Sequence, residues 1–440
     1  MPPAPKADIR KYAWFLFFLL TACYALVSFF RTSTSTLAVD IMRDFAVGGG
    51  LMSVMSSAFF YPYGFMQIPA GILSDRWGSR NTITLFMLLG AAGALLFALA
   101  PNVGLATTGR VIIGMGMGMV FVPSLRVFLR WFPMHQHVLI TGLILSLGSG
   151  GMLLATWPLM KLTEFAGWRG SMLIAAALTV AMSIAVWIWA RNTPEEKFGN
   201  DVVIHGRIPV STTKKKPLPL RIVMASIVRK PAYWGISVWF FCIYGSFFAI
   251  TSLWAGPYFI QGYGMSKDAA GGVLFFMALG AVLGPSLAGF IAQRGTFSKK
   301  FLLLLSCIIS LVLGAPLLVP SPVLPEFILP AWALLFGIFC GGFGGIALAK
   351  VQDEFPSQIV GTATGMINIY CYIGTALLQL VSGCIMEWQA PGQSSYQLSQ
   401  YAVMFMLFMT MFFCALVAVF FCLRSEEKKA PVPQPQRSDS

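Results

Sequence analysis

The sequence predicts an all-α integral membrane protein with twelve transmembrane helices arranged as two halves of six. Of its 440 residues, 57% are hydrophobic and 10% are charged, whereas roughly 25% of the residues are charged in ordinary soluble domains. Twelve apolar runs are long enough to cross a membrane, because a helical span needs about 20 residues. Hydrocarbon offers no partners to bare backbone groups, and the runs greatly exceed the roughly 10-residue strands of membrane barrels, so they must be helices.

The apolar runs fall into two groups of six. The first group covers residues 13–36, 48–70, 81–100, 105–128, 138–161 and 170–190, and the second covers 232–256, 269–292, 301–320, 328–349, 359–385 and 399–423. The segment between the groups is polar, basic and proline-containing, which is typical of a linker. We therefore expect an N-terminal half at 1–191, a cytoplasmic linker at 192–230, a C-terminal half at 231–424 and a disordered cytoplasmic tail at 425–440.

The distribution of positive charge predicts the orientation of the chain. If the N-terminus lies inside, the cytoplasmic segments hold 24 of the 30 Lys and Arg residues. This asymmetry places both termini in the cytoplasm, and it explains the net charge without nucleic acid. The cluster Lys214–Lys216 then signals topology, or it contacts anionic lipids as an alternative. Short loops favour a bacterial inner membrane.

Several classes of site are missing from the sequence. The eight cysteines show no Cys-x-x-Cys spacing, so neither a disulfide framework nor a metal site is expected. There is no Gly-x-x-x-x-Gly-Lys-Ser/Thr loop to bind nucleotide phosphates. No nucleophile–base pair is embedded in a span. We therefore expect no enzyme, no cofactor and no ATP-driven motor.

Arg31 is the main candidate for binding chemistry because it lies deep within the first predicted span. A charge at that depth is costly, so it normally faces the interior of the bundle and has a partner. Tyr24, Ser28 and Ser35 are spaced to share its helix face. A guanidinium on such a polar stripe can hold a carboxylate or phosphate through two parallel hydrogen bonds. In the alternative, Arg31 reaches the membrane surface or neutralises a nearby carboxylate.

Three other spans carry comparable polar stripes, and together the four stripes predict a shared polar interior. For any single stripe, hydrogen bonding between helices explains the pattern as well as substrate contact does. The candidate substrate contacts are Tyr24, Ser28 and Arg31 in the first span, Tyr63 and Gln67 in the second, Tyr244 and Thr251 in the seventh, and Asn368, Tyr372 and Gln379 in the eleventh.

Two similar loops lie 218 positions apart, about half the length of the chain, which indicates a duplicated membrane unit. The first runs from Gly71 to Arg80 with the pattern Gly-x-Leu-x-Asp-Arg-x-Gly-x-Arg, and the weaker copy begins at Gly289. This pattern resembles the signature loop of the major facilitator superfamily. The resemblance implies the major facilitator fold, a cavity lined by spans one, two, seven and eleven, and a cytoplasmic latch built from Gly71, Asp75, Arg76, Gly78, Arg80 and Arg294.

Further motifs are similar to those of the anion:cation symporter branch of that superfamily. They are Ser57–Tyr61, Gln67–Gly71, Arg110–Gly116, Trp131–Pro133, Gly167–Arg169 and Gly361–Asn368. In that branch the arginine of the first span holds the anionic group of the substrate, so the resemblance implies this role for Arg31. Arg110 is a candidate proton relay, or it reaches the membrane surface.

The sequence also departs from that branch. Met117 stands where relatives often have a glutamate, and none of the sixteen acidic residues falls inside a predicted span. Proton relays usually need an embedded carboxylate or histidine. This leaves uniport, anion exchange, or symport in which the substrate, Asp40 or Asp44 carries the proton. The same two aspartates are the alternative partners for Arg31.

The sequence therefore predicts a monomeric secondary transporter that moves a small organic anion of carboxylate type across the bacterial inner membrane by alternating access. The expected partners are the lipid bilayer and a coupling proton or counter-anion. One rival interpretation is a multidrug exporter, in which some of the 12 Trp and 37 Phe residues would line a hydrophobic pocket. Such pumps generally need an embedded carboxylate to attract cations, and the predicted spans contain none. The other is a transporter-like sensor whose basic linker docks a signalling partner.

Overall fold

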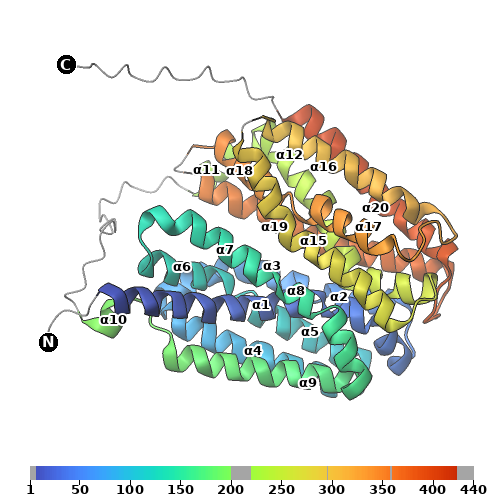
Figure 1. The fold of residues 1–440 in the computed structure, drawn as a ribbon, viewed down its shortest axis with the longest axis horizontal. Coiled ribbons are helices and arrows are strands. Elements are labelled where there is room, and N and C mark those ends of the chain that lie inside the picture. The colour runs from blue at the N-terminus through green and yellow to red at the C-terminus, as the bar shows by residue number, and fades with distance from the viewer. Residues whose placement is uncertain (1–5, 200–219, 295, 357–358, 424–440) are drawn as a thin grey trace.

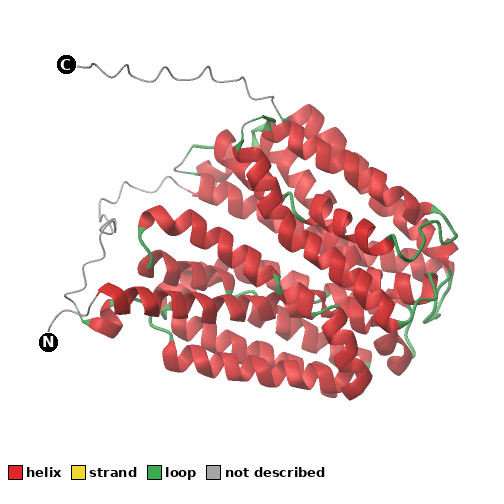
Figure 2. Cartoon of the chain, in the orientation of Figure 1, coloured by secondary structure: helices red, strands yellow, loops and turns green. Residues whose placement is uncertain are grey.

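The computed structural model describes residues 6–199, 220–294, 296–356 and 359–423. These residues form helices joined by turns and loops, with no strand among them (Figure 2). Ten helical segments are long and apolar enough to cross a membrane. The predicted all-α membrane fold is confirmed. The predicted tail at 425–440 and the Lys214–Lys216 cluster lie outside the described residues.

The N-terminal part of the chain forms one group of helices, in the lower part of Figure 1. In order they are α1 (Lys6–Phe45), α2 (Gly49–Ser57), α3 (Phe60–Arg76), α4 (Ser79–Leu99), α5 (Val103–Met117), α6 (Phe121–Trp131), α7 (His137–Ser149), α8 (Gly151–Leu154), α9 (Trp157–Trp189) and α10 (Glu195–Phe198). Long α4 packs against α5 and α9, and α1 packs against α7 and α9.

The C-terminal part forms a second group, at the upper right of Figure 1. It consists of α11 (Leu220–Val228), α12 (Pro231–Trp239), η2 (Phe240–Tyr244), α13 (Gly245–Ala249), η3 (Ile250–Trp254), α14 (Ala255–Pro257), η4 (Tyr258–Gly262), α15 (Lys267–Gln293), α16 (Lys299–Gly314), η5 (Ala315–Leu318), α17 (Leu329–Phe336), η6 (Gly337–Gly341), α18 (Gly344–Glu354), α19 (Val360–Gln389) and α20 (Leu398–Cys422). Here α20 packs against α12 and α16, while α15 packs against α17. The exact domain boundaries stay predictions.

The ten apolar segments correspond to twelve crossings of the described chain. One segment, Leu139–Trp189, is 51 residues long and is broken by Gly167, whose φ of 68° and ψ of 172° are not helical. After this break the chain returns, since Trp189 accepts a hydrogen bond from Tyr12 near the beginning of α1. Helices α2 and α3 both pack against α5 and form the remaining crossing.

Gly167 gives the first testable prediction. No atom lies within 4 Å of the place that a Cβ would occupy there, so replacing Gly167 by Ala costs backbone strain alone. We expect the free energy of unfolding to fall by about 1–3 kcal/mol, seen as a lower thermal unfolding temperature. Gly272→Ala is the control, because Gly272 lies in open space within helical α15 and should be neutral or stabilising. Equal unfolding temperatures for the two variants would contradict the prediction.

The end of one span differs from the sequence prediction. The first span was expected to end at 36, but α1 continues to Phe45 because Leu37, Ala38, Ile41 and Met42 keep helical spacing and are all buried. Asp40 and Asp44 therefore belong to a spanning helix. The predicted linker at 192–230 contains the short helix α11, whose Ile227 is fully buried.

The hydrogen bonds and ion pairs that join the two halves within the described residues gather at one end of the bundle. We call the end where α1 finishes the far end, and the end where α1 begins the near end. Helix α2 packs against α19, α1 packs against η3 and α14, and α9 packs against α15. Hydrogen bonds or ion pairs join Ser35 to Gly256, Asp40 to Lys267, Gly49 to Tyr396, Gly50 to Glu387, and both Trp157 and Lys161 to Asp268. The structure is thus closed at the far end.

Candidate functional site

Arg31 lies in the interior of the bundle, where the two halves meet. Only 5% of its surface is exposed, so it does not reach the membrane surface. Its Nη2 donates a hydrogen bond to Oγ of Ser28, one helical turn earlier, at 3.3 Å. Its guanidinium carbon lies 4.6 Å from the centre of the ring of Phe248, which belongs to α13 in the other half. A cation over an aromatic face is attracted by the ring.

Four tyrosines lie near this guanidinium. The phenols of Tyr24, Tyr63 and Tyr372 lie within electrostatic range of Arg31, and so does that of Tyr244. The rings of Tyr63 and Tyr372 meet edge to face with centres 4.8 Å apart, which joins α3 to α19 across the halves. The four helical regions that the sequence singled out therefore each place a tyrosine, with a hydroxyl that can donate a hydrogen bond, near one positive charge.

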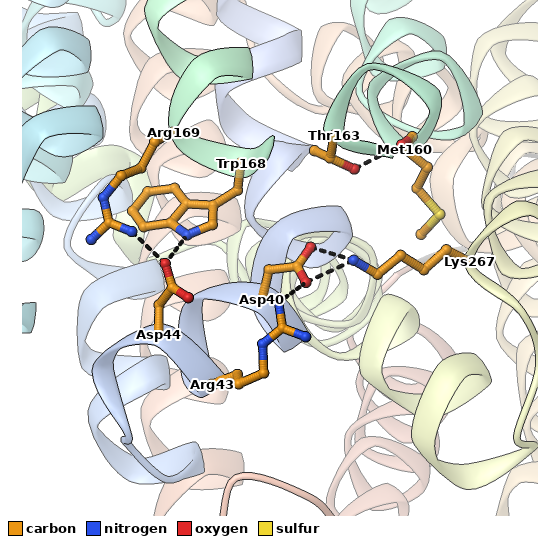
Figure 3. A network of polar contacts seen from close by, with 8 residues as sticks. All are labelled: Asp40, Arg43, Asp44, Met160, Thr163, Trp168, Arg169 and Lys267. Carbon is orange, nitrogen blue, oxygen red and sulfur yellow. Dashed lines mark hydrogen bonds and ion pairs between the residues drawn. The ribbon is translucent and has the colours of Figure 1, made fainter. Parts of the chain in front are cut away.

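Arg31 has no acidic partner among the described residues. Its Nε atom is buried without a hydrogen-bond partner. The expected alternative partners are occupied elsewhere: Asp40 pairs with Lys267, and Asp44 pairs with Arg169 (Figure 3). The interpretation in which Arg31 neutralises either aspartate is therefore wrong for this conformation. A buried charge without a partner is costly, and an anion that supplies oxygen atoms would remove that cost.

Ser28 and the four tyrosines are thus the predicted contacts that the structure brings to Arg31. Gln67 and Asn368 are half-buried on α3 and α19. Thr251 donates to the carbonyl of Phe247 at 2.8 Å and lines a small cavity between the halves. The cavity is also lined by Thr32, Met152, Thr156, Leu274, Met277 and Ala278.

Gln379 was predicted to contact the substrate, but in this conformation its side chain binds a neighbouring helix. It is fully buried, and its Nε2 donates a hydrogen bond of 2.7 Å to Ser252. One turn further along α19, Ser382 accepts a hydrogen bond of 2.7 Å from Nε1 of Trp254. Both bonds hold α19 against η3 within the C-terminal half. This end of the eleventh-span stripe therefore serves helix packing in this conformation.

Arg110 on α5 is also buried, with 1% of its surface exposed. Its Nη1 donates to the carbonyl of Phe30 at 2.9 Å, one residue before Arg31. The guanidinium lies over the ring of Phe59 at 5.0 Å, and its Nε and Nη2 have no partner. The suggestion that Arg110 reaches the membrane surface does not fit this burial; a relay role stays a prediction.

Arg110 gives a prediction that separates stability from function. Methionine has a similar length without the charge, so Arg110→Met removes a buried cation that lacks an acidic partner. We expect the free energy of unfolding to rise by roughly 1–3 kcal/mol while transport falls, because costly embedded charges are usually retained for function. Thermal unfolding and uptake into proteoliposomes measure the two effects. A less stable variant with unchanged uptake would refute this assignment.

The predicted latch residues lie at the near end and contact their own half. Asp75 pairs with Arg126 of α6, and Arg80 donates to the carbonyl of Trp187 at 2.8 Å. Gly78 has a φ of 79°, which a glycine adopts without strain. Arg294 is exposed and stacks on Phe290 at 4.3 Å. Gly71 and Arg76 lie in α3. A latch across the halves would require the opposite conformation and stays a prediction.

Two features of the interior were not predicted from the sequence. Phe248 carries no polar atom, so nothing distinguished it from core residues before its ring was found facing Arg31. The Asp40–Lys267 pair joins residues 227 positions apart, and only the group of charges at the end of α1 hinted at a partner. Within the described residues, no group of three or more His, Cys, Asp or Glu could hold a metal ion.

Comparisons with known proteins agree with this architecture. The family model of the Major Facilitator Superfamily matches residues 20–378. The probable galactarate/D-glucarate transporter GudP of Bacillus subtilis (strain 168) is 24% identical, and the match covers 88% of each chain. The hexuronate transporter of Escherichia coli (strain K12) is also 24% identical, with 86% of this chain and 89% of the relative covered.

Comparison with solved structures shows the same fold. A bacterial homologue of the human lysosomal transporter Spinster, described as inward-facing and unoccupied, superposes with a TM-score of 0.75 at 16% identity, covering 93% of this chain and 98% of that one. The resemblance to the anion:cation symporter branch is confirmed by the anion-transporting relatives. The chain belongs to the Major Facilitator Superfamily and is a secondary transporter of that family.

Proposed function

We propose that this transporter moves a small organic anion of carboxylate type, and that Arg31 binds its anionic group. One observation carries the proposal: a buried guanidinium, without an acidic partner among the described residues, lies between the two halves and near four tyrosines. Arginine is suited to this task because its rigid fork of donors matches the two oxygens of a carboxylate. The names of the relatives, which refer to sugar acids, support the same chemistry.

The transport cycle is alternating access, in which the two halves rock around a site near the middle of the membrane. Positive charge concentrated at the near end supports a cytoplasmic position for that end and for both termini in a bacterial inner membrane. The contacts gathered at the far end then correspond to a state closed to the outside.

A ligand panel tests the proposal. We would measure the thermal stabilisation of purified protein by monocarboxylates, dicarboxylates, sugar acids, phosphate esters and lipophilic cations, since a ligand that binds only the folded state stabilises it. The expected result is an anion that stabilises the wild type and not Arg31→Ala. Stabilisation by lipophilic cations alone, equal in both proteins, would overturn the proposal in favour of a drug exporter.

A further inference from the structure

A second charged cluster, at the far end, joins α1 to α15 (Figure 3). Nζ of Lys267 donates to both oxygens of the Asp40 carboxylate, at 2.7 and 2.6 Å. Arg43, one turn along α1, donates to the same carboxylate at 3.3 Å. Asp40 thus binds one cation from each half of the protein, and the stronger contact is the one that crosses between the halves.

A neighbouring contact braces this pair. Asp268 follows Lys267 in the first turn of α15, where the positive end of the helix favours a carboxylate. It accepts a hydrogen bond of 2.7 Å from Nε1 of Trp157 and pairs with Lys161 at 2.8 Å. The start of α15 is therefore tied to both α1 and α9 by charged groups.

Asp44 provides a contrast within the same cluster. It lies one turn beyond Asp40 on α1, and it accepts hydrogen bonds from Nε1 of Trp168 at 2.7 Å and from Arg169. Both donors belong to α9, in the N-terminal half (Figure 3). Asp44 therefore stabilises one half internally, whereas Asp40 connects the two halves. The pair of aspartates separates these two roles on a single helix.

Asp40 is also the most enclosed carboxylate among the described residues, with 6% of its surface exposed. No acidic side chain among the described residues lies beside Arg31. The enclosed carboxylate of the described residues therefore lies at the far end rather than beside the anion site.

We propose that Asp40 and Lys267 form an ion-pair gate at the far end, which holds the two halves together there and separates when this end opens. The inference rests on the proposed alternating-access cycle. When the halves separate at this end, Lys267 leaves with α15, and Asp40 keeps only Arg43, whose side chain is 76% exposed and hence weakly effective. The ion pair therefore stabilises the closed state alone, so removing either partner shifts the equilibrium towards the open gate.

The other charged groups at this end do not replace Lys267. From α9 they are Lys161, Glu164 and Arg169, which pair with Asp268, with one another or with Asp44. Helices α2, α8, η3 and α14, which also pack against α1, contribute no Asp, Glu, Lys, Arg or His at all.

The test measures the width of the far end without any substrate. Spin labels would be attached through Phe165→Cys and Phe327→Cys, which are 92% and 82% exposed and belong to different halves. Native Cys384, Cys414 and Cys422, which are not buried, would be replaced by Ser. Distance distributions from double electron–electron resonance would then be recorded in lipid nanodiscs without added anion.

We expect the wild type to show mainly the short distance. Asp40→Asn should raise the open population by about tenfold, because it removes the ion pair that stabilises the closed state. Lys267→Met should also open the gate, which keeps the test informative if one variant folds poorly. Asp44→Asn should behave as the wild type.

If Asp40→Asn gave the same distance distribution as the wild type, the assignment of the gate to Asp40 would be wrong. Lys267→Met with wild-type distances would overturn it as well, because the proposed gate needs both partners of the ion pair. Because no anion is added, neither result depends on whether Arg31 binds the substrate, so a failure of the gate is distinguishable from a failure of the proposed function.

Discussion

Replacing Arg31 by Gln should reduce anion transport by about 30-fold or more, because leaving a buried anion without its charged partner costs ~2 kcal/mol or more. Arg31→Lys should also lose most of the activity, since an ammonium keeps the charge but cannot offer two parallel donors. The measurement is initial uptake of the anion identified by thermal stabilisation into proteoliposomes. Both variants should fold, because they alter a guanidinium that has no acidic partner among the described residues.

Arg191→Gln is the control for loss of a positive charge. Arg191 lies just after α9 and donates to the carbonyls of Ile188 and Ala190, away from the proposed site. Its replacement should leave uptake within about twofold of the wild type. If Arg31→Gln transported as well as Arg191→Gln, the assignment of the anion site would be wrong.

The second large effect is expected at Gly256, where α14 approaches α1. Its N–H donates to Oγ of Ser35 at 2.8 Å, and a Cβ added there would lie 2.1 Å from the Ser35 carbonyl oxygen. Because that neighbour is backbone, it cannot move aside locally. Gly256→Val should therefore prevent closure of the far end and reduce uptake by about tenfold or more, while anion binding to Arg31 persists.

Uptake and ligand-induced stabilisation, measured on the same preparation, check this prediction. Gly345→Ala is the matched control, because Gly345 lies in α18 of the same half and a Cβ there would meet nothing within 4 Å. It should transport normally. Unimpaired uptake by Gly256→Val would mean that close approach of α14 to α1 is not needed in the cycle.

The membrane fold could be predicted from the sequence because hydrocarbon imposes a strong rule on it. Each span must be long, apolar and helical, so apolar runs define the helices almost directly. Helix ends are less constrained. The first span extends beyond the apolar run to Phe45, because helix spacing and packing continue after hydropathy falls.

The position of Arg31 could also be predicted, since a charge deep in a span has few structural roles. Its surroundings could be predicted only as helix faces. Polar stripes cannot distinguish a side chain that lies near Arg31, such as Tyr63, from one that holds two helices of the same half together, such as Gln379. That distinction depends on how the two halves dock.

Ion pairs between residues far apart in the chain could not be predicted from the sequence. Asp40 and Lys267 are 227 positions apart, and each lies near other charges with which it could equally have paired. Only the packing of α15 beside α1 and α9 selects the partner. The residues assigned to the far-end gate therefore come from the structure, whereas the residues assigned to the anion site come from both.

Equilibrium counterflow tests the central claim most directly. Proteoliposomes would be loaded with the unlabelled anion and diluted into a trace of the labelled anion, so that exchange is seen whatever the coupling ion or direction. We predict transient accumulation of label with the wild type and none with Arg31→Gln. An anion that stabilises the wild type but is never exchanged, or exchange that persists in Arg31→Gln, would contradict an anion transporter built on Arg31.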